Sequence, residues 1–164
     1  MYVVLWMLVL GEGFLIIGLI RSVYELRRTR STSMVQEKRA PVFEAVDQFG
    51  QPITSAALAG RPYGLLFVTP SCLKCWEAVS NIEAIRRRAG DEVIIVCQGS
   101  RHECLGLIDS LASGLTTVID EEGEILRGFG ITSVPTAVIV DSDGVIESIG
   151  QIFHGKEIEE FIGE

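Results

Sequence analysis

The first residues of the chain form an apolar run that limits what they can fold into. Residues 2–20 contain a single charged side chain, Glu12, in nineteen positions. As a helix rising about 1.5 Å per residue, this run is roughly 28 Å long, close to the roughly 30 Å hydrocarbon thickness of a bilayer. A cleaved signal peptide would show a basic leading segment, a shorter apolar core and a small-residue cleavage site, and the run has none of these. We therefore predict a retained transmembrane anchor, with a buried core helix as the alternative.

Charge is distributed unevenly behind this run. Residues 21–39 carry six basic and two acidic side chains, whereas residues 40–164 carry eight basic and nineteen acidic ones. An acidic main region argues against nucleic-acid binding, which needs a basic surface. The basic stem would place the main region in the cytoplasm by the positive-inside rule. We divide the chain into an anchor (1–21), a basic stem and linker (22–40) and one folded domain (41–164).

Strand and helix patterns alternate through this domain. Short apolar runs predict buried strands, helical spacing of apolar residues predicts amphipathic helices, and turn residues between apolar segments predict hairpins. The expected elements are strands at 63–69, 92–97 and 116–120, helices at 71–90, 101–113 and 154–164, and hairpins over 42–54 and 136–150. Together they describe a compact α/β sandwich of about 120 residues.

Two cysteines, Cys72 and Cys75, lie where the strand at 63–69 passes into the following helix. At a helix N-terminus the unpaired backbone N–H groups and the helix dipole stabilise a thiolate, and Lys74 adds a positive charge. We assign Cys72 as the nucleophile and Cys75, one turn further in, as the resolving thiol that releases a mixed disulfide. The alternatives are half of a zinc site or two core cysteines. Zinc needs about four ligands, and the chain has no second Cys-x-x-Cys or paired His, so we expect no metal or other cofactor.

The other two cysteines, Cys97 and Cys104, stand outside this motif. Cys97 ends the strand at 92–97, at the sheet edge that also carries the Cys72 motif, so we expect it near the reactive pair. We interpret both as small buried core residues, a common fate of free cysteine. A second disulfide, or a relay that receives oxidising equivalents, is the alternative.

The strand, the Cys-x-x-Cys motif and the helix, followed sixty residues later by Val134-Pro135-Thr136, resemble the thioredoxin superfamily. Within it the chain is similar to the membrane-anchored TlpA/ResA group, and most to the methylamine utilisation protein D type. The resemblance covers roughly residues 40–164 and is carried by the segments APVFEAVDQFGQPIT, GRPYGLLFVTPSCLKC, VIIVCQGSRHEC, FGITSVPTAVIVDSDGVI and GQIFHGKEIEEFI. It implies a thioredoxin-like α/β fold, a central mixed sheet flanked by helices, behind an N-terminal transmembrane helix. The implied activity is thiol–disulfide exchange.

The resemblance also implies residue roles. Pro135 matches the cis-proline that packs against the reactive pair, and Val134 matches the residue that pairs with the substrate backbone. From its position directly after Cys75, and not from the resemblance, Trp76 either shields the pair by packing or forms part of the substrate surface, and the charge of Lys74 tunes activity. Thioredoxins keep a buried Asp on the strand before the motif as proton acceptor for the second cysteine. That strand has no acid here, so water or Glu77 would serve.

The implied partners are a protein thiol or disulfide substrate, a redox partner that resets the cysteine pair, and the membrane through residues 2–20. Relatives of this type act on an exported target, in the methylamine group the disulfide-rich small subunit of a dehydrogenase. Because long domains can be translocated against the charge bias, we expect the domain on the extracytoplasmic side despite the basic stem.

Two other functions share part of the motif. Thr69-Pro70-Ser71-Cys72 reproduces the Thr-x-x-Cys of a peroxiredoxin, but the proline expected four residues before that Thr is Leu65 here. A copper chaperone of the Sco type uses Cys-x-x-x-Cys and a His near the cis-proline, and Ser133-Val134-Pro135 offers no such ligand. We therefore favour disulfide exchange over peroxide reduction and copper binding.

Overall fold

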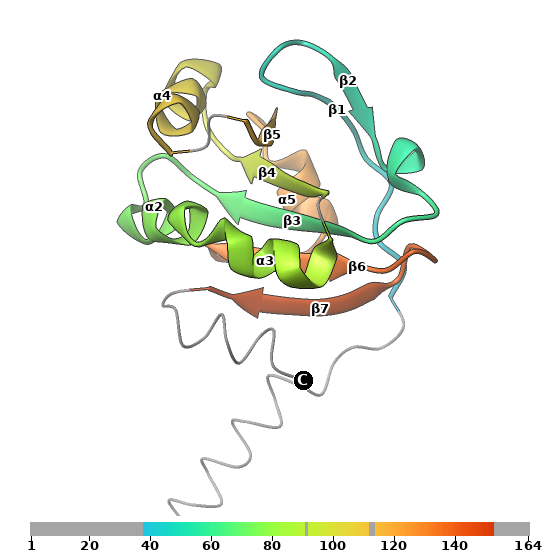
Figure 1. Cartoon of the computed structure of the whole chain (residues 1–164). Coiled ribbons are helices and arrows are strands. Elements are labelled where there is room, and N and C mark those ends of the chain that lie inside the picture. Colours follow the sequence, from blue (N-terminus) through green and yellow to red (C-terminus); the bar gives the residue numbers. More distant parts are fainter. Residues whose placement is uncertain (1–37, 91, 112–113, 153–164) are drawn as a thin grey trace, which may run out of the picture. The chain divides into compact units, whose positions relative to one another are not determined.

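The computed structural model describes residues 38–90, 92–111 and 114–152 (Figure 1). The predicted anchor at 2–20, most of the stem and the predicted closing helix at 154–164 lie outside the described residues. Within the described ranges, no helix has both the length and the apolar character needed to cross a bilayer.

A mixed five-stranded sheet in the order β5-β4-β3-β6-β7 forms the centre of the fold (Figure 1). Its strands are β3 (Tyr63–Val68), β4 (Val93–Cys97), β5 (Thr116–Ile119), β6 (Thr136–Val140) and β7 (Ile146–Gln151). Strands β3, β4 and β5 run parallel, whereas β6 is antiparallel to both β3 and β7. All residues of β3 are buried, as expected for a central strand covered on both faces.

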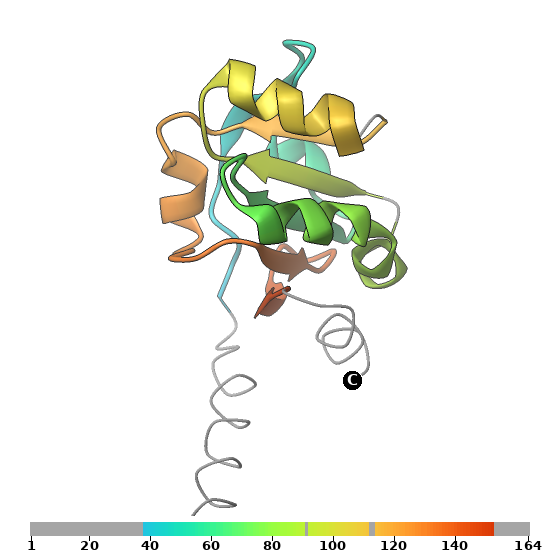
Figure 2. The same cartoon turned by 90° about the vertical axis from the view of Figure 1, so that its left-hand side faces the viewer.

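Different elements cover the two faces of the sheet, as Figures 1 and 2 show. On one face, α2 (Leu73–Ser80), α3 (Ile82–Ala89) and α4 (Arg101–Leu111) contribute to one apolar cluster with β3, β4 and β6. On the other face the cluster includes Phe43, Leu58 and Phe129. These residues come from the segment before β1 (Glu44–Val46), the 3-10 helix η1 (Ser55–Leu58) and the end of α5 (Glu124–Gly128). Strand β1 pairs with β2 (Pro52–Thr54) in a separate hairpin.

The sequence predicted the sheet strands, both hairpins and α4 within a few residues. The single helix expected at 71–90 is wrong, because the chain forms α2 and α3 with a break at Asn81. There the Asn81 side chain donates to the backbone oxygen of Glu77 at 2.8 Å and competes for a helical acceptor. Helix α5 was not predicted, and its first turn depends on Asp120, whose carboxylate accepts the N–H groups of Glu124 and Leu126.

Helix α3 approaches β3 closely at Gly64, which gives a stability test. A Cβ added at Gly64 would lie 2.9 Å from the Cβ of Ala89 and 3.0 Å from Cγ2 of Ile85. We expect Gly64→Ala to lower the free energy of unfolding by about 1–3 kcal/mol through overpacking. Gly106→Ala on α4, where an added Cβ meets nothing within 4 Å, is the control and should be neutral or stabilising by about 1 kcal/mol. Urea denaturation of the full chain measures both values, and equal effects would contradict the packing argument.

Candidate active site

Cys72 occupies the N-cap position of α2, directly after the three residues that follow β3. Its backbone is extended, with φ −101° and ψ 109°, and its Sγ accepts the backbone N–H of Cys75 at 3.3 Å. The Cys72 backbone N–H in turn donates to the Thr69 carbonyl at 3.2 Å. The predicted placement of Cys72 at a helix N-terminus is confirmed, and the Cys75 N–H, which also donates to the Cys72 carbonyl at 3.0 Å, contacts its sulfur.

The two free thiols of this motif differ in burial. Cys72 is partly exposed, whereas Cys75 is 0% exposed and belongs to the apolar cluster under α2. The pKa of Cys75 is raised to about 12, mainly by burial and also by the hydrogen bond with the Cys72 side chain, while a backbone hydrogen bond at Thr69 partly opposes them. At neutral pH Cys75 is therefore a thiol, and only Cys72 is accessible to a molecule in solution.

The loop before β6 lies against Cys72. The Val134–Pro135 peptide bond is cis, as the resemblance predicts, and the Cys72 thiol donates a long hydrogen bond of 4.0 Å to the Val134 carbonyl. Pro135 is buried and Val134 is half-buried. The structure thus brings Val134 and Pro135 to the cysteine motif, although they lie about sixty residues away in the sequence.

Three contacts that sequence reasoning missed hold this loop. The Thr136 hydroxyl donates to the Ser133 carbonyl at 2.7 Å, and the Gln151 side-chain amide donates to the Ser133 hydroxyl. The backbone N–H of Ile152 donates to the Pro135 carbonyl at 3.2 Å. Since β6 and β7 were both predicted, their pairing was the available signal: register places Thr136 opposite Gln151.

Of the residues next to the two cysteines, Trp76 is half-buried, whereas Leu73 and Lys74 are exposed. The Trp76 ring nitrogen donates to the Pro70 carbonyl at 3.2 Å, and the half-buried indole packs against the core. This contact favours the packing interpretation of Trp76 over a projecting substrate surface. Lys74 is exposed. Leu73, which sequence reasoning did not single out, is 84% exposed beside Cys72 and gives the site an apolar surface.

No buried carboxylate serves Cys75 in the part of the chain that the structure describes. Its two buried acids, Asp47 and Asp120, accept backbone N–H groups in the β1–β2 turn and at the start of α5. Glu77 is exposed on α2. The residues described here also contain no group of three or more His, Cys, Asp or Glu arranged to hold a metal ion.

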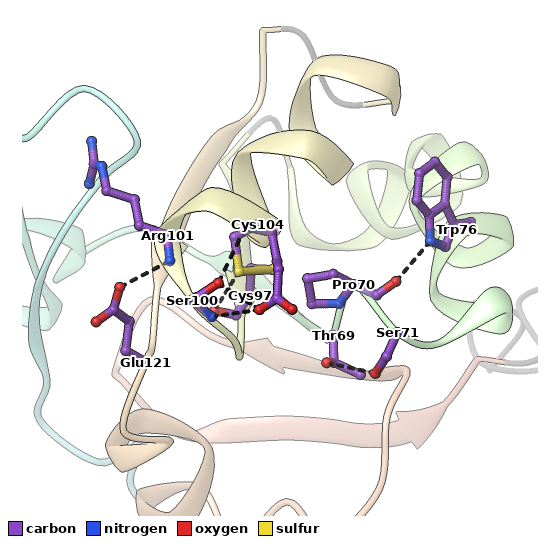
Figure 3. The surroundings of a disulfide bond; sticks show 10 residues. Thr69, Pro70, Ser71, Trp76, Cys97, Ser100, Arg101, Cys104 and Glu121 are labelled. Carbon is purple, nitrogen blue, oxygen red and sulfur yellow. Dashed lines mark hydrogen bonds between the residues drawn. A yellow bond between two sulfur atoms is a disulfide. The ribbon is translucent and has the colours of Figure 1, made fainter.

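The interpretation of Cys97 and Cys104 as free core cysteines is wrong, because the two form a disulfide. Both are 0% exposed, so the expected burial is correct. Cys97 pairs in register with Val68 at the end of β3, which places the disulfide beside the residues that lead into the active site (Figure 3). The alternative of a second disulfide is therefore confirmed.

An accessible cysteine at a helix start, a buried partner and a cis-proline loop, set on this mixed sheet, define a thiol–disulfide oxidoreductase of thioredoxin-like fold. The AhpC/TSA family model matches residues 37–149. The chain belongs to this family.

Individual relatives agree with this class. The chain is 30% identical over 159 residues to the methylamine utilization protein MauD of Paracoccus denitrificans, covering 90% of this chain and 78% of the relative. It is 23% identical over 146 residues to the thiol-disulfide oxidoreductase ResA of Bacillus thuringiensis, covering 86% and 84%. A thiol-disulfide oxidoreductase structure from Bacteroides fragilis superposes with a TM-score of 0.63 at 18% identity, covering 75% of this chain and 96% of that one. At that identity the superposition shows the fold.

The raised pKa of Cys75 predicts how this thiol reacts alone. In Cys72→Ser, burial, the largest cause of the raised pKa, remains. Iodoacetamide should therefore alkylate Cys75 slowly at neutral pH, with a rate that rises about tenfold per pH unit and shows no plateau below about pH 10. Cys75→Ser, which leaves the exposed Cys72, is the matched variant and should react faster at neutral pH. A plateau for Cys75 near the ordinary thiol pKa would contradict its burial.

Proposed function

We propose that the chain is a membrane-anchored oxidoreductase that exchanges disulfides with protein substrates through Cys72 and Cys75. The observation that carries this proposal is the contrast in burial: Cys72 is partly exposed at the N-cap of α2, and Cys75 is fully buried one turn away. Cys72 is then the nucleophile and Cys75 the resolving thiol.

The exchange proceeds in two balanced steps. The Cys72 thiolate attacks one sulfur of the substrate disulfide, the substrate S–S bond breaks, and a substrate thiolate leaves. Cys75 then loses its proton to water and attacks Cys72 Sγ, which releases the second substrate thiolate. The substrate gains two electrons and the Cys72–Cys75 pair loses two, so a redox partner must reset it. The Cys75 N–H aimed at Cys72 Sγ stabilises this sulfur when it carries charge.

The loop around the cis bond supplies the substrate contacts in this proposal. Val134 is half-buried next to Cys72, so its backbone groups pair with an extended substrate segment beside the nucleophile. Pro135, behind it, holds the loop against the motif. Leu73, exposed on the other side of Cys72, offers apolar contact, and Trp76 stabilises the loop that presents Cys72. Lys74 adds positive charge near the reacting sulfur and tunes its activity.

The proposed location is the extracytoplasmic side of the membrane, with residues 1–21 as a single anchor, 22–40 as the stem and 41–164 as the domain. The Cys97–Cys104 disulfide supports this side, because stable disulfides persist in oxidising compartments and are rare in the cytosol. The disulfide and the basic stem point to opposite sides, because the positive charge of the stem biases the domain toward the cytoplasm.

The proposed substrate is an exported protein rich in disulfides, such as the small subunit of a methylamine dehydrogenase. The relative from Paracoccus denitrificans is named for methylamine utilization, and the chain covers 78% of it. The partly exposed Cys72 and the exposed Leu73 beside it are compatible with a protein substrate that presents its disulfide on an extended segment.

Substitution of each cysteine tests the activity. With the full chain in mild detergent and a disulfide-containing protein substrate, Cys72→Ser should lower the exchange rate by about 10³-fold or more. Cys75→Ser should instead trap a mixed disulfide between Cys72 and the substrate, visible by non-reducing electrophoresis. If Cys72→Ser keeps exchange, or if hydrogen peroxide is turned over far faster than any disulfide, the proposed function is wrong.

Labelling in cells tests the location. All four cysteines of the chain lie in residues 72–104, so Cys75→Ser leaves Cys72 as the accessible thiol. A membrane-impermeant maleimide should label this variant in intact spheroplasts, and Cys72→Ser/Cys75→Ser should remain unlabelled. Labelling that appears only after lysis would place the domain in the cytoplasm.

A further inference from the structure

The Cys97–Cys104 disulfide closes a short loop at the end of β4, beside the residues that lead from β3 to Cys72. It joins the end of β4 to the first turn of α4 across seven residues, with a Cα–Cα distance of 6.0 Å. Residues 98–100, which we name the cross-linked loop, lie between the two cysteines. Gln98 begins this loop, and its backbone N–H donates to the Val68 carbonyl at 2.9 Å.

The cross-linked loop touches the residues that present Cys72. A Cβ added at Gly99 would lie 3.3 Å from Cδ of Pro70 and 3.6 Å from Sγ of Cys104. Pro70 and the disulfide therefore border the space beside Gly99, which has φ +154°. Figure 3 shows Pro70 beside the disulfide, on the side toward Trp76, whose ring nitrogen donates to the Pro70 carbonyl.

The far side of the cross-linked loop is also held. The Ser100 backbone N–H and hydroxyl donate to the Glu103 carboxylate at 3.2 and 2.6 Å, and these hydrogen bonds lower the pKa of Glu103. The Arg101 N–H donates to the Glu121 carboxylate at 3.0 Å, and its guanidinium donates to the Gln48 carbonyl at 2.7 Å. These groups are exposed, so they contribute little stability each; the disulfide is the buried, covalent part of the arrangement.

Burial separates this disulfide from exchange. Thiol–disulfide exchange requires a thiolate to reach one of the two sulfurs, and Cys97 and Cys104 are both 0% exposed. The Cys104 sulfur is bonded to the Cys97 sulfur and lies 3.5 Å from the Cys97 carbonyl oxygen. Toward the active site, its neighbour is the backbone at Gly99, with Pro70 next.

We propose that the Cys97–Cys104 disulfide is a permanent cross-link that positions the 69–71 segment, and through it Cys72, without exchanging electrons with the Cys72–Cys75 pair. Cys97, Cys104 and Gly99 are positioning residues: the disulfide fixes the cross-linked loop, the loop supports Pro70, and Pro70 anchors Trp76 at the start of α2. This inference rests on the proposed roles of Cys72 and Cys75.

Counting thiols in the unmodified protein tests the absence of exchange. The oxidised full chain is reduced with dithiothreitol in mild detergent, alkylated at intervals and analysed by mass spectrometry. Without denaturant we expect Cys72 to be alkylated first and the buried Cys75 slowly, while Cys97 and Cys104 stay joined as a disulfide; with guanidinium we expect all four cysteines to be alkylated. If Cys97 and Cys104 become alkylated under native conditions together with the active pair, and Cys72→Ser prevents it, the disulfide is a relay and the proposal is overturned.

Two variants test the positioning. Cys97→Ala/Cys104→Ala removes the cross-link, and we expect its rate of reaction with oxidised glutathione to fall about tenfold, because small displacements of a reacting group are costly. On a Trp6→Phe background, so that Trp76 is the only tryptophan, the fluorescence response to oxidation should change as well. Leu107→Ala, also fully buried on α4, is the control for lost stability and should keep both the rate and the fluorescence response.

Gly99→Ala keeps every cysteine and acts on the contact itself. Its added Cβ would lie 3.3 Å from Pro70, and φ +154° strains the backbone of any L residue there, so the cross-linked loop must shift and the same loss of rate is expected. A native rate in this variant would overturn the positioning role even if the double variant does not fold. Native rate and fluorescence in either folded variant would overturn the positioning role. Such a result would leave the proposed function intact, because that function fails only if Cys72→Ser retains exchange.

Discussion

The structure depends on the complete burial of β3 in the centre of the sheet. Helices pack on one face of the strand and η1, α5 and the segment before β1 on the other, so its backbone can be satisfied only by β4 and β6. The point at which β3 ends, at the carboxyl end of the parallel strands, is thereby fixed. The segment that follows must turn across that end of the sheet into α2, and this turn places Cys72 at a helix N-terminus rather than in the middle of a helix.

The same packing creates the chemical difference between two cysteines that are only three residues apart. Cys72 lies before the first turn of α2, where no helix backbone covers it, whereas Cys75 faces the core and is 0% exposed. Burial keeps Cys75 protonated, with its pKa raised to about 12; in the proposed exchange it therefore reacts only after the mixed disulfide forms at Cys72. The order of the two steps therefore follows from position on the helix and requires no separate control.

Much of this could be predicted from the sequence, because the strong signals are local. The apolar run of β3, the turn residues of the hairpins and the Cys-x-x-Cys spacing each act within about ten residues. The features that the sequence predicted wrongly or missed depend on contacts between residues that a local pattern does not contain. The break at Asn81 comes from a side chain that competes for a helical carbonyl, α5 begins on the carboxylate of Asp120, and the Cys97–Cys104 bond needed the distance between β4 and α4. The support of the cis-proline loop by Gln151 likewise depends on strand register.

The two cysteine pairs, Cys72–Cys75 and Cys97–Cys104, have the same chemical groups but differ in how accessible their sulfurs are to other molecules. Both pairs lie where β3 and β4 end, and in the oxidising compartment that we propose, every accessible thiol would meet other disulfides. A second accessible pair would compete with Cys72 for substrate and for the resetting partner. With both sulfurs at 0% exposure, Cys97 and Cys104 avoid this competition, and in the proposed role their bond supports the loop beside Pro70 in either redox state of the active pair. A rigid support for Cys72 that is unaffected by the reaction it supports is what repeated turnover requires.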